Sequence, residues 1–367
     1  MENSVNSEAS NNSLLDVLGR TYGGKRIFVT GHNGFVGSWL SSVLLQAGAQ
    51  IVGYSLPQYS GGMAELIELN KECTSIEGDV RNLRELEAAL HRYEPEIIFH
   101  LAAQPLVIPS FENPLETLST NIMGTANVLD AIRRQKSLIA CVVVTSDKCY
   151  ATAPSAHDES DPLGGDDIYS ASKGAAEIIT HAFRMSFLQQ SGPSTASARA
   201  GNIVGGGDWA EFRIVPDMIR AIRAEEPVCL RHPNAIRPWQ HVLDAVAGYL
   251  RLGDALVRNG SEAAEGWNFG PHPDAEVTVA ELVELFLAHW RQLGGGVQGS
   301  IYDQNPSLSE REYLTLRSFK AETRLGWSQL LNFEETIGWT AEWYFKSSTR
   351  QNAREVTHDQ IHRYLEL

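Results

Sequence analysis

Two short segments carry side chains whose types and spacing suit proton transfer. Tyr169 and Lys173 form a Tyr-x-x-x-Lys sequence, and at positions i and i+4 of a helix the two side chains share one face. We expect the ammonium group to lower the pKa of the phenol, so that Tyr169 can act as a base for a substrate hydroxyl. Because this sequence is common by chance, the pair needs support from its surroundings.

The second segment is Ser146-Asp147-Lys148, which directly follows an apolar run rich in valine. In open α/β sheets, ligands bind outside the carboxyl ends of the strands. Ser146 could bond the hydroxyl that Tyr169 deprotonates, while Asp147 and Lys148 offer a further acid and base. A solvated turn at a strand end is the alternative for Asp147 and Lys148 taken alone.

A glycine-rich segment, Thr30–Gly37, lies between an apolar run and a helical pattern. Gly31 allows a tight turn, Gly34 lets the backbone approach a pyrophosphate, and Gly37 lets the helix pack close to the sheet. Free N–H groups at the start of the following helix attract an anion. The segment predicts a dinucleotide site, with a turn that binds nothing as the alternative.

Two positions further along bear on the choice between NAD and NADP. Ser55 stands where an acidic residue usually bonds the adenosine ribose, and no arginine stands beside it to attract a 2′-phosphate. Serine can still bond the ribose hydroxyl, so NAD is favoured. Asp79, which precedes Val80, suits a bond to the adenine amino group, and a helix N-cap is its alternative role.

Apolar runs that indicate buried strands alternate with helical patterns along the first part of the chain. This alternation predicts right-handed βαβ units and an α/β fold with a doubly wound parallel sheet, the Rossmann arrangement. The expected strands are Lys25–Thr30, Gln50–Ser55, Thr74–Glu77, Glu96–Leu101, Leu138–Thr145 and Thr195–Arg199. The expected helices between them are Phe35–Gln46, Leu83–His91, Leu115–Arg134 and Glu177–Leu188.

Composition and pattern divide the chain into four parts. We expect a polar, disordered leader at 1–22 and an NAD-binding domain at 23–200. A smaller, mostly helical substrate lobe at 201–350 should be interleaved with that domain, and a tail follows at 351–367. The expected helices of the lobe are Val215–Ala224, Val242–Val257, Val279–Gln292 and Phe333–Tyr344.

Bulk composition excludes several classes of protein. With 367 residues, 43% of them hydrophobic, the chain can bury a large core. A net charge of -15 argues against a nucleic-acid partner. The four cysteines form no Cys-x-x-Cys pair, so we expect no metal site and reduced thiols in the cytoplasm. We find no apolar run that would make a signal peptide or span a bilayer.

Several longer runs resemble the extended short-chain dehydrogenase/reductase family. Within that family, the sequence resembles the enzymes that carry out the 4,6-dehydration of CDP-glucose. The similarity extends from Gly24 to about Tyr344. The runs that carry it are His100–Val107, Ser119–Thr125, Thr145–Tyr150, Asp161–Gly165, Arg199–Ala210, Ile236–Leu243 and Glu265–Gly270.

The resemblance implies a bound NAD+ that stores a hydride temporarily. Tyr169, helped by Lys173 and Ser146, would take the proton of the sugar C4 hydroxyl as hydride leaves C4. Asp147 would then protonate the departing C6 hydroxyl, and Lys148 would take the C5 proton. Return of the hydride to C6 gives a 4-keto-6-deoxy sugar nucleotide without net oxidation.

The resemblance also implies binding residues and an assembly. The cofactor residues would be Gly31, Asn33, Gly34, Phe35, Gly37, Ser55, Asp79, Val80, Leu101, Ala102, Ala103, Asn121, Tyr169 and Lys173. The residues for the nucleotide sugar, with CDP-hexose favoured, would be Gln104, Asn202, Arg213 and Arg237. The forked guanidinium groups suit a diphosphate, and a surface ion pair is their alternative role. We expect a homodimer formed through the Leu115–Arg134 helix and the helix of Tyr169.

Three positions depart from the family pattern. Ile108 stands where arginine is usual, Val36 where lysine is usual, and Arg317 where aspartate is preferred. The changes at Ile108 and Arg317 could alter the substrate pocket, so they bear on the nucleotide and the hexose rather than on the reaction.

Two other functions compete with dehydration. A sugar-nucleotide 4-epimerase or reductase on the same scaffold needs Tyr169 and Lys173 but has no use for Asp147 and Lys148. A non-catalytic NAD-binding protein would have no need of a complete Tyr–Lys pair.

Overall fold

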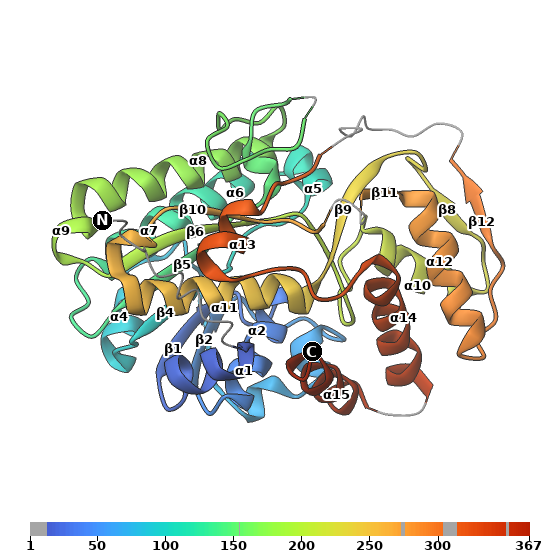
Figure 1. The fold of residues 1–367 in the computed structure, drawn as a ribbon, viewed down its shortest axis with the longest axis horizontal. Helices are drawn as coiled ribbons and strands as arrows, with labels where there is room; N and C mark the ends of the chain where they lie inside the picture. The colour runs from blue at the N-terminus through green and yellow to red at the C-terminus, as the bar shows by residue number, and fades with distance from the viewer. Residues whose placement is uncertain (1–12, 154, 273–275, 304–313, 350–351) are drawn as a thin grey trace, which may run out of the picture.

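A seven-stranded parallel sheet forms the centre of the protein. The structure is a computed structural model that describes residues 13–153, 155–272, 276–303, 314–349 and 352–367. The strands run in the order β10-β6-β5-β4-β1-β2-β3 (Figure 1), which confirms the predicted doubly wound sheet. Their bounds are β1 Arg26–Thr30, β2 Gln50–Ser55, β3 Thr74–Glu77, β4 Ile97–His100, β5 Ala140–Val144, β6 Ser194–Ala200 and β10 Gly266–Phe269.

Helices cover both faces of this sheet and bury a separate apolar cluster on each. On one face lie α2 (Phe35–Gln46) and α11 (Val242–Asn259), which contact each other. On the other face lie α4 (Leu83–Tyr93), α7 (Thr125–Ile132) and α8 (Ile168–Phe183) (Figure 1). The segment before α7 consists of α5 (Val107–Glu112), α6 (Pro114–Leu118) and the π-helical turn η3 (Ser119–Gly124).

Helix α8 begins earlier than the expected start at Glu177. It starts at Ile168 because Asp167 caps it, with Asp167 Oδ1 accepting a hydrogen bond from the Ser170 amide at 2.9 Å. The helix continues into a π-helical turn, η5 (Arg184–Leu188). The earlier start places Tyr169 in the first turn, at the carboxyl edge of the sheet.

The second half of the chain adds a smaller body beside the sheet (Figure 1). It contains a three-stranded sheet in the order β11-β9-β7 and a parallel pair, β12-β8. Strand β10 comes from this half but lies in the main sheet beside β6, and α11 covers the main sheet as well. The strands are β7 Asn202–Val204, β8 Val228–Leu230, β9 Ile236–His241, β11 Glu276–Thr278 and β12 Ser300–Tyr302. The helices of this body are α10 Ile214–Ala224, α12 Val279–Gln292 and α14 Phe333–Thr349, whereas α13 Phe319–Leu325 contacts β10 and α11.

The expected disordered leader is wrong for residues 13–22, which form α1 (Leu14–Val17) and η1 (Leu18–Tyr22). Ser13 and Asp16 make a capping box, and the apolar side chains of the segment pack into the core. Tyr22 Oη donates to the carbonyl of Leu250 on α11 at 2.5 Å. The apolar face of this segment was not predicted because the sequence around it is polar. Residues 1–12 of the leader lie outside the described residues.

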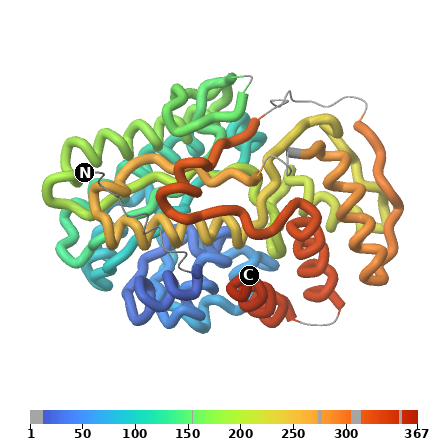
Figure 2. Tube along the Cα trace, in the orientation of Figure 1, coloured from blue at the N-terminus to red at the C-terminus, as the bar shows by residue number. Residues whose placement is uncertain are grey.

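The chain ends in a packed helix, α15 (Ala353–Leu365), where only a tail was expected. Tyr364 Oη donates to Asp244 Oδ1 at 2.7 Å and ties α15 to α11. Figure 2 shows this red helix beside the blue N-terminal segments, in agreement with the contact between α15 and α2. Within the described ranges, no helix is long and apolar enough to cross a membrane.

The N-terminal helix gives a direct test of this packing. Leu18 is 2% exposed, whereas Leu15 on the same segment is 58% exposed. Leu18→Ala should lower the free energy of unfolding by about 2–4 kcal/mol because it leaves a cavity. Leu15→Ala should change it by less than about 0.5 kcal/mol. Urea unfolding of both variants measures the difference, and equal effects would show that the segment does not join the core.

Candidate active site

The loop between β1 and α2 forms a cradle that only glycine allows. Gly31 has a φ of 76°, and a Cβ on it would lie 2.7 Å from the Ala102 amide nitrogen. A Cβ on Gly37 would lie 2.1 Å from the Gly31 carbonyl oxygen. The first amides of α2 point out of this loop, where a helix N-terminus attracts negative charge. The loop therefore fits the pyrophosphate of a dinucleotide.

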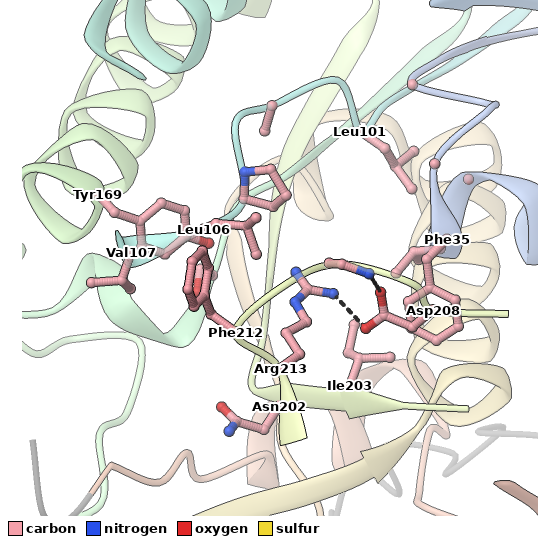
Figure 3. Close-up of a pocket in the computed structure, with 18 of the residues that line it drawn as sticks. Phe35, Leu101, Leu106, Val107, Tyr169, Asn202, Ile203, Asp208, Phe212 and Arg213 are labelled. Carbon is pink, nitrogen blue, oxygen red and sulfur yellow. Dashed lines mark hydrogen bonds and ion pairs between the residues drawn. The ribbon is translucent and has the colours of Figure 1, made fainter. Parts of the chain in front are cut away.

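A cavity of about 820 Å³ extends from this cradle along the carboxyl ends of the strands and into the smaller body. Figure 3 draws part of its wall, including Tyr169, Asn202 and the contact between Asp208 and Arg213. The predicted site residues that line it are Gly31, Asn33, Gly34, Phe35, Gly37, Ser55, Asp79, Val80, Leu101, Ala102, Ala103, Ser146, Asp147, Lys148, Tyr169, Lys173, Asn202, Arg213 and Arg237.

A buried histidine fixes the hydroxyl of Ser55 at one end of the cavity. His32 Nδ1 lies 2.9 Å from Ser55 Oγ, and His32 Nε2 lies 2.8 Å from Ser75 Oγ. Burial lowers the pKa of His32 to about 4, so the ring is neutral near pH 7. The Asn33 amide donates to Ser55 Oγ at 3.3 Å. The hydroxyl is thus oriented beside the cradle, where a ribose would lie.

Asp79 does not cap a helix, so that alternative is wrong. Asn82 caps α4 instead, and Asp79 Oδ2 forms an ion pair with Arg81 Nη2 at 2.6 Å. Arg81 also lines the cavity. Sequence spacing from Ser55 gave no sign of this arginine, because Arg81 reaches the site from the turn after β3, the strand that pairs with β2.

Asp147 is a buried carboxyl group at the carboxyl end of β5. It is 2% exposed, and its Oδ1 accepts a hydrogen bond from Ser146 Oγ at 2.8 Å. Its Oδ2 has no hydrogen-bond partner among the described residues. Burial raises the pKa of Asp147, although Lys148, Ser146 and Arg237 oppose the rise. A carboxyl group held in this way can keep its proton and act as a general acid.

Tyr169 and Lys173 lie one helical turn apart and both face the cavity. Burial raises the pKa of Tyr169 to about 12, against a hydrogen bond with Ser146 that lowers it. The expectation that Lys173 lowers this pKa is therefore wrong for the free protein, because desolvation of the phenolate dominates. Burial also lowers the pKa of Lys173 to about 8. Lys173 is therefore close to a change of charge, whereas Tyr169 is a neutral phenol in the free protein.

Arginine side chains line the part of the cavity formed by the smaller body. Arg213 Nη1 pairs with Asp208 Oδ2 at 2.9 Å (Figure 3), and 33% of the Arg213 side chain is exposed. Arg237 is buried on β9 and donates to the carbonyl of Ile236 at 2.8 Å. Because Arg237 acts on the pKa of Asp147, it also lies near the acid–base segment. A bound anion could use both guanidinium groups.

Two predicted binding residues hold the protein together instead. Gln104 Nε2 donates to the Leu106 carbonyl at 2.9 Å and to Thr117 Oγ1 at 2.8 Å. Asn121 Nδ2 donates to Ser172 Oγ at 2.9 Å, and Asn121 Oδ1 accepts from the Gln104 amide at 2.8 Å. Neither residue lines the cavity. They link the loop after β4 to α8, so their side chains are engaged within the protein, and their assignment to substrate and cofactor stays a prediction.

Other cavity residues were absent from the predicted site. Tyr249 on α11 is buried, and its hydroxyl has no partner among the described residues. The charges of Tyr169 and Asp147 add to the burial that raises the Tyr249 pKa, which places this hydroxyl near the reactive groups. No sequence motif marks it. Of the departures from the family pattern, Val36 and Ile108 line the cavity.

The glycine cradle, the doubly wound sheet and the Tyr–Lys pair at its carboxyl edge define an NAD-dependent enzyme of the Rossmann type. Residues 27–264 match the model of the NAD dependent epimerase/dehydratase family. The chain belongs to this family.

Comparison with individual relatives shows which enzymes the chain resembles. The chain is 41% identical over 329 residues to CDP-glucose 4,6-dehydratase of Salmonella typhimurium, which covers 88% of this chain and 90% of the relative. It is 27% identical to dTDP-glucose 4,6-dehydratase of Neisseria gonorrhoeae, over 91% of this chain and 100% of the relative. Among solved structures, MoeE5 in complex with UDP-glucose and NAD is similar with a TM-score of 0.74 and 25% identity, covering 88% of this chain and 100% of that chain.

Lys173 gives a prediction about stability and pH. Its pKa is about 8 in the folded protein but 10.5 in its ordinary state, so the unfolded chain binds the proton more tightly. Burial of this charge therefore costs stability below pH 8, and the cost falls as the pH rises from about 8 to 10. Lys173→Met should raise the free energy of unfolding at pH 7 by on the order of 3 kcal/mol. It should also remove the gain in stability that the parent shows between about pH 8 and pH 10.

Urea unfolding at pH 7 and pH 9.5 measures the effect. The exposed Lys136 provides the control, and Lys136→Met should leave both the stability and its pH dependence close to those of the parent. A Lys173→Met protein less stable than the parent at pH 7 would contradict the burial of a charged ammonium.

Proposed function

We propose that the protein is a sugar-nucleotide 4,6-dehydratase that converts CDP-glucose to CDP-4-keto-6-deoxyglucose. The observation that carries the proposal is the buried carboxyl group of Asp147, with one oxygen unpartnered among the described residues, next to Lys148 in the wall of the NAD cavity. Oxidation and reduction at C4 need no such acid–base pair. The 41% identity to a CDP-glucose 4,6-dehydratase supports both the reaction and the nucleotide.

In the first half of the reaction the protein removes a proton from the sugar. An NAD+ held by the cradle of Gly31, Gly34 and Gly37 would supply a temporary store for the C4 hydride, so that the reaction would have no net oxidation. Tyr169 takes the proton of the C4 hydroxyl, and Ser146 holds the same oxygen through its own hydroxyl. The ammonium of Lys173, one turn from Tyr169, favours the phenolate as the proton leaves. The product of this half is a 4-keto sugar.

The ketone makes the C5 proton acidic, so water can now be eliminated. Lys148 takes the C5 proton, and Asp147 donates its proton to the C6 hydroxyl, which leaves as water. Burial raises the pKa of this carboxyl group, which favours the protonated form that the step needs. The hydride then adds to C6 and a proton to C5. One molecule of water is the only other product.

The substrate diphosphate would lie between the cradle and the smaller body. Arg213 and Arg237 line that part of the cavity and carry forked guanidinium groups. Asn202, at the start of β7, also lines the cavity and can add a neutral hydrogen bond. These local cations offset a chain whose net charge is -15. The diphosphate would share Arg213 with Asp208.

A panel of nucleotide hexoses tests the reaction and the substrate together. The purified protein with NAD+ should remove one water from CDP-glucose, seen by mass spectrometry and by the alkaline absorbance of a 4-keto product. UDP-, dTDP- and GDP-glucose should react more slowly. A product of unchanged mass would identify an epimerase instead, and no turnover of any sugar despite bound NAD+ would favour a non-catalytic protein.

Replacement of the proposed acid should separate the two halves of the reaction. Asp147→Asn keeps the size of the side chain but cannot donate a proton, so dehydration should fall by at least about 100-fold. Reduction of bound NAD+ by CDP-glucose should persist, because it needs only Tyr169, Lys173 and Ser146. Stopped-flow absorbance of NADH measures it. Asp359→Asn, remote on α15, is the control, and full dehydration by Asp147→Asn would contradict the assignment.

We further propose that the protein is a cytoplasmic homodimer. The outer faces of α5 to η3 and of α8 to η5 expose large apolar side chains, and α7 packs beside α8. Such a patch marks an interface, and two helices from each copy would make a four-helix bundle. The exposed residues are Phe111, Leu115, Met123, Ile178 and Met185. All four cysteines are free thiols, which suits the cytoplasm.

Light scattering after size exclusion measures the assembly. The parent protein should be a dimer at micromolar concentration, and Ile178→Glu should shift it toward the monomer because it buries a charge at the interface. Phe319→Glu, at an exposed position on α13, should leave the dimer intact. A monomeric parent would refute the proposed assembly.

A further inference from the structure

Glu177 is a buried carboxylate that the proposed reaction does not use. It lies on α8, and its Oε1 accepts a hydrogen bond from Thr145 Oγ1 at 2.5 Å. Its Oε2 accepts from Ser197 Oγ at 2.7 Å and from Arg199 Nη2 at 2.6 Å. The single side chain therefore connects α8 with the carboxyl end of β5 and with β6.

The surroundings of the ion pair keep both partners charged. The pKa of Glu177 is lowered despite its burial, since Arg199, Thr145 and Ser197 outweigh the desolvation. Arg199 also donates to Tyr150 Oη at 2.6 Å, so the guanidinium is fixed. A buried pair of this kind is weak evidence for stability, because apolar residues of similar volume often replace one without loss. Its place beside the reactive groups indicates another role.

That place is next to both reactive segments. Thr145 directly precedes Ser146, so the bond from Thr145 to Glu177 fixes the start of the acid–base segment against α8. Glu177 follows Lys173 by one helical turn, and Tyr169 by two, on the face of α8 that packs against the sheet. Glu177 thus adds a direct bond between the start of the acid–base segment and the helix that carries the Tyr–Lys pair.

Glu177 is also the negatively charged group that acts on the pKa of Lys173. Burial lowers the pKa of Lys173, and both Cys149 and Glu177 oppose that fall. Burial raises the pKa of Cys149, so its thiol is neutral and Glu177 supplies the charge. The other ionisable groups that face Glu177 and Lys173 are His100 on β4, Arg184 on η5 and Arg199 on β6. Burial lowers the pKa of His100 to about 3.

We propose that Glu177 is a positioning residue for the site: it holds the Thr145–Lys148 segment in line with α8 and supplies the negative charge that keeps Lys173 an ammonium ion. The part of the inference that concerns the acid–base segment rests on the proposed function. The part that concerns the effect of Glu177 on Lys173 does not. Glu177 acts through Lys173 and Ser146 and touches no substrate.

The pH dependence of NAD+ binding tests the effect on Lys173 without any turnover. Isothermal titration calorimetry gives the Kd of NAD+ for the full chain between pH 6 and pH 10. In the variant Glu177→Gln with Arg199→Met, glutamine can keep both hydroxyl partners and no unpaired charge is left. The alkaline limb of binding should move down by about one pH unit, because the Glu177 charge that opposes the fall of the Lys173 pKa is lost, whereas the Arg199 charge lost with it is not among the causes of that shift. A folded double variant with an unmoved limb overturns the proposal.

Two conservative variants keep the proposal testable if the double variant does not fold. Glu177→Asp retains the charge, so the limb should stay within about 0.3 pH units of the parent; a full shift overturns the proposal. Thr145→Val removes the bond to Glu177, together with a longer one to the Ala198 carbonyl at 3.3 Å, and leaves the Glu177 charge in place, so kcat for CDP-glucose should fall at least tenfold while the limb stays in place. An unchanged kcat overturns the positioning half. If the parent dehydrates no sugar, the proposed function fails, and the NAD+ limb alone decides the role of Glu177.

Discussion

The site depends on one constraint: the groups at the carboxyl end of β5 are buried away from water. Burial there raises the pKa of Asp147 and of Tyr169 and lowers that of Lys173. Each shift favours the uncharged form, as desolvation must. The raised pKa of Asp147 favours the protonated acid, and the pKa of about 8 keeps Lys173 near a change of charge. A solvated strand end with the same residues would have ordinary pKa values and no such division of roles.

The rest of the fold keeps that buried edge in register. The glycine cradle brings α2 and the loop after β4 close together, because a Cβ at Gly31 would meet the backbone of Ala102. Asn121 and Gln104 secure the same loop to α8. The second half of the chain closes the cavity from the other side and contributes Arg213 and Arg237. Strand β10 and helix α11 join the two halves through the main sheet, so the cavity walls share one core.

Local patterns in the sequence were enough for six of the seven strands of the main sheet and for the cradle, whereas the edge strand β10 was not predicted. Strands such as Ala140–Val144 are apolar on both faces, and the glycine spacing after β1 has a steric reason that can be stated without a structure. Long-range effects were not accessible in this way. The burial that reverses the expected pKa of Tyr169 depends on segments far away in the chain, as do the partners of Gln104 and the ion pair of Glu177 with Arg199. The helix Leu14–Val17 was missed because its core partner, α11, lies more than two hundred residues away.

The fate of the C4 hydrogen tests the central claim most directly. If one active site oxidises C4, expels water from C5 and C6, and returns the same hydride, CDP-glucose deuterated at C4 should give a product that carries the deuterium at C6. NMR of the product formed in ordinary water should show this label, and unlabelled CDP-glucose turned over in D2O should give a product with deuterium at C5. Deuterium retained at C4, or absent from C6 in a dehydrated product, would contradict this mechanism.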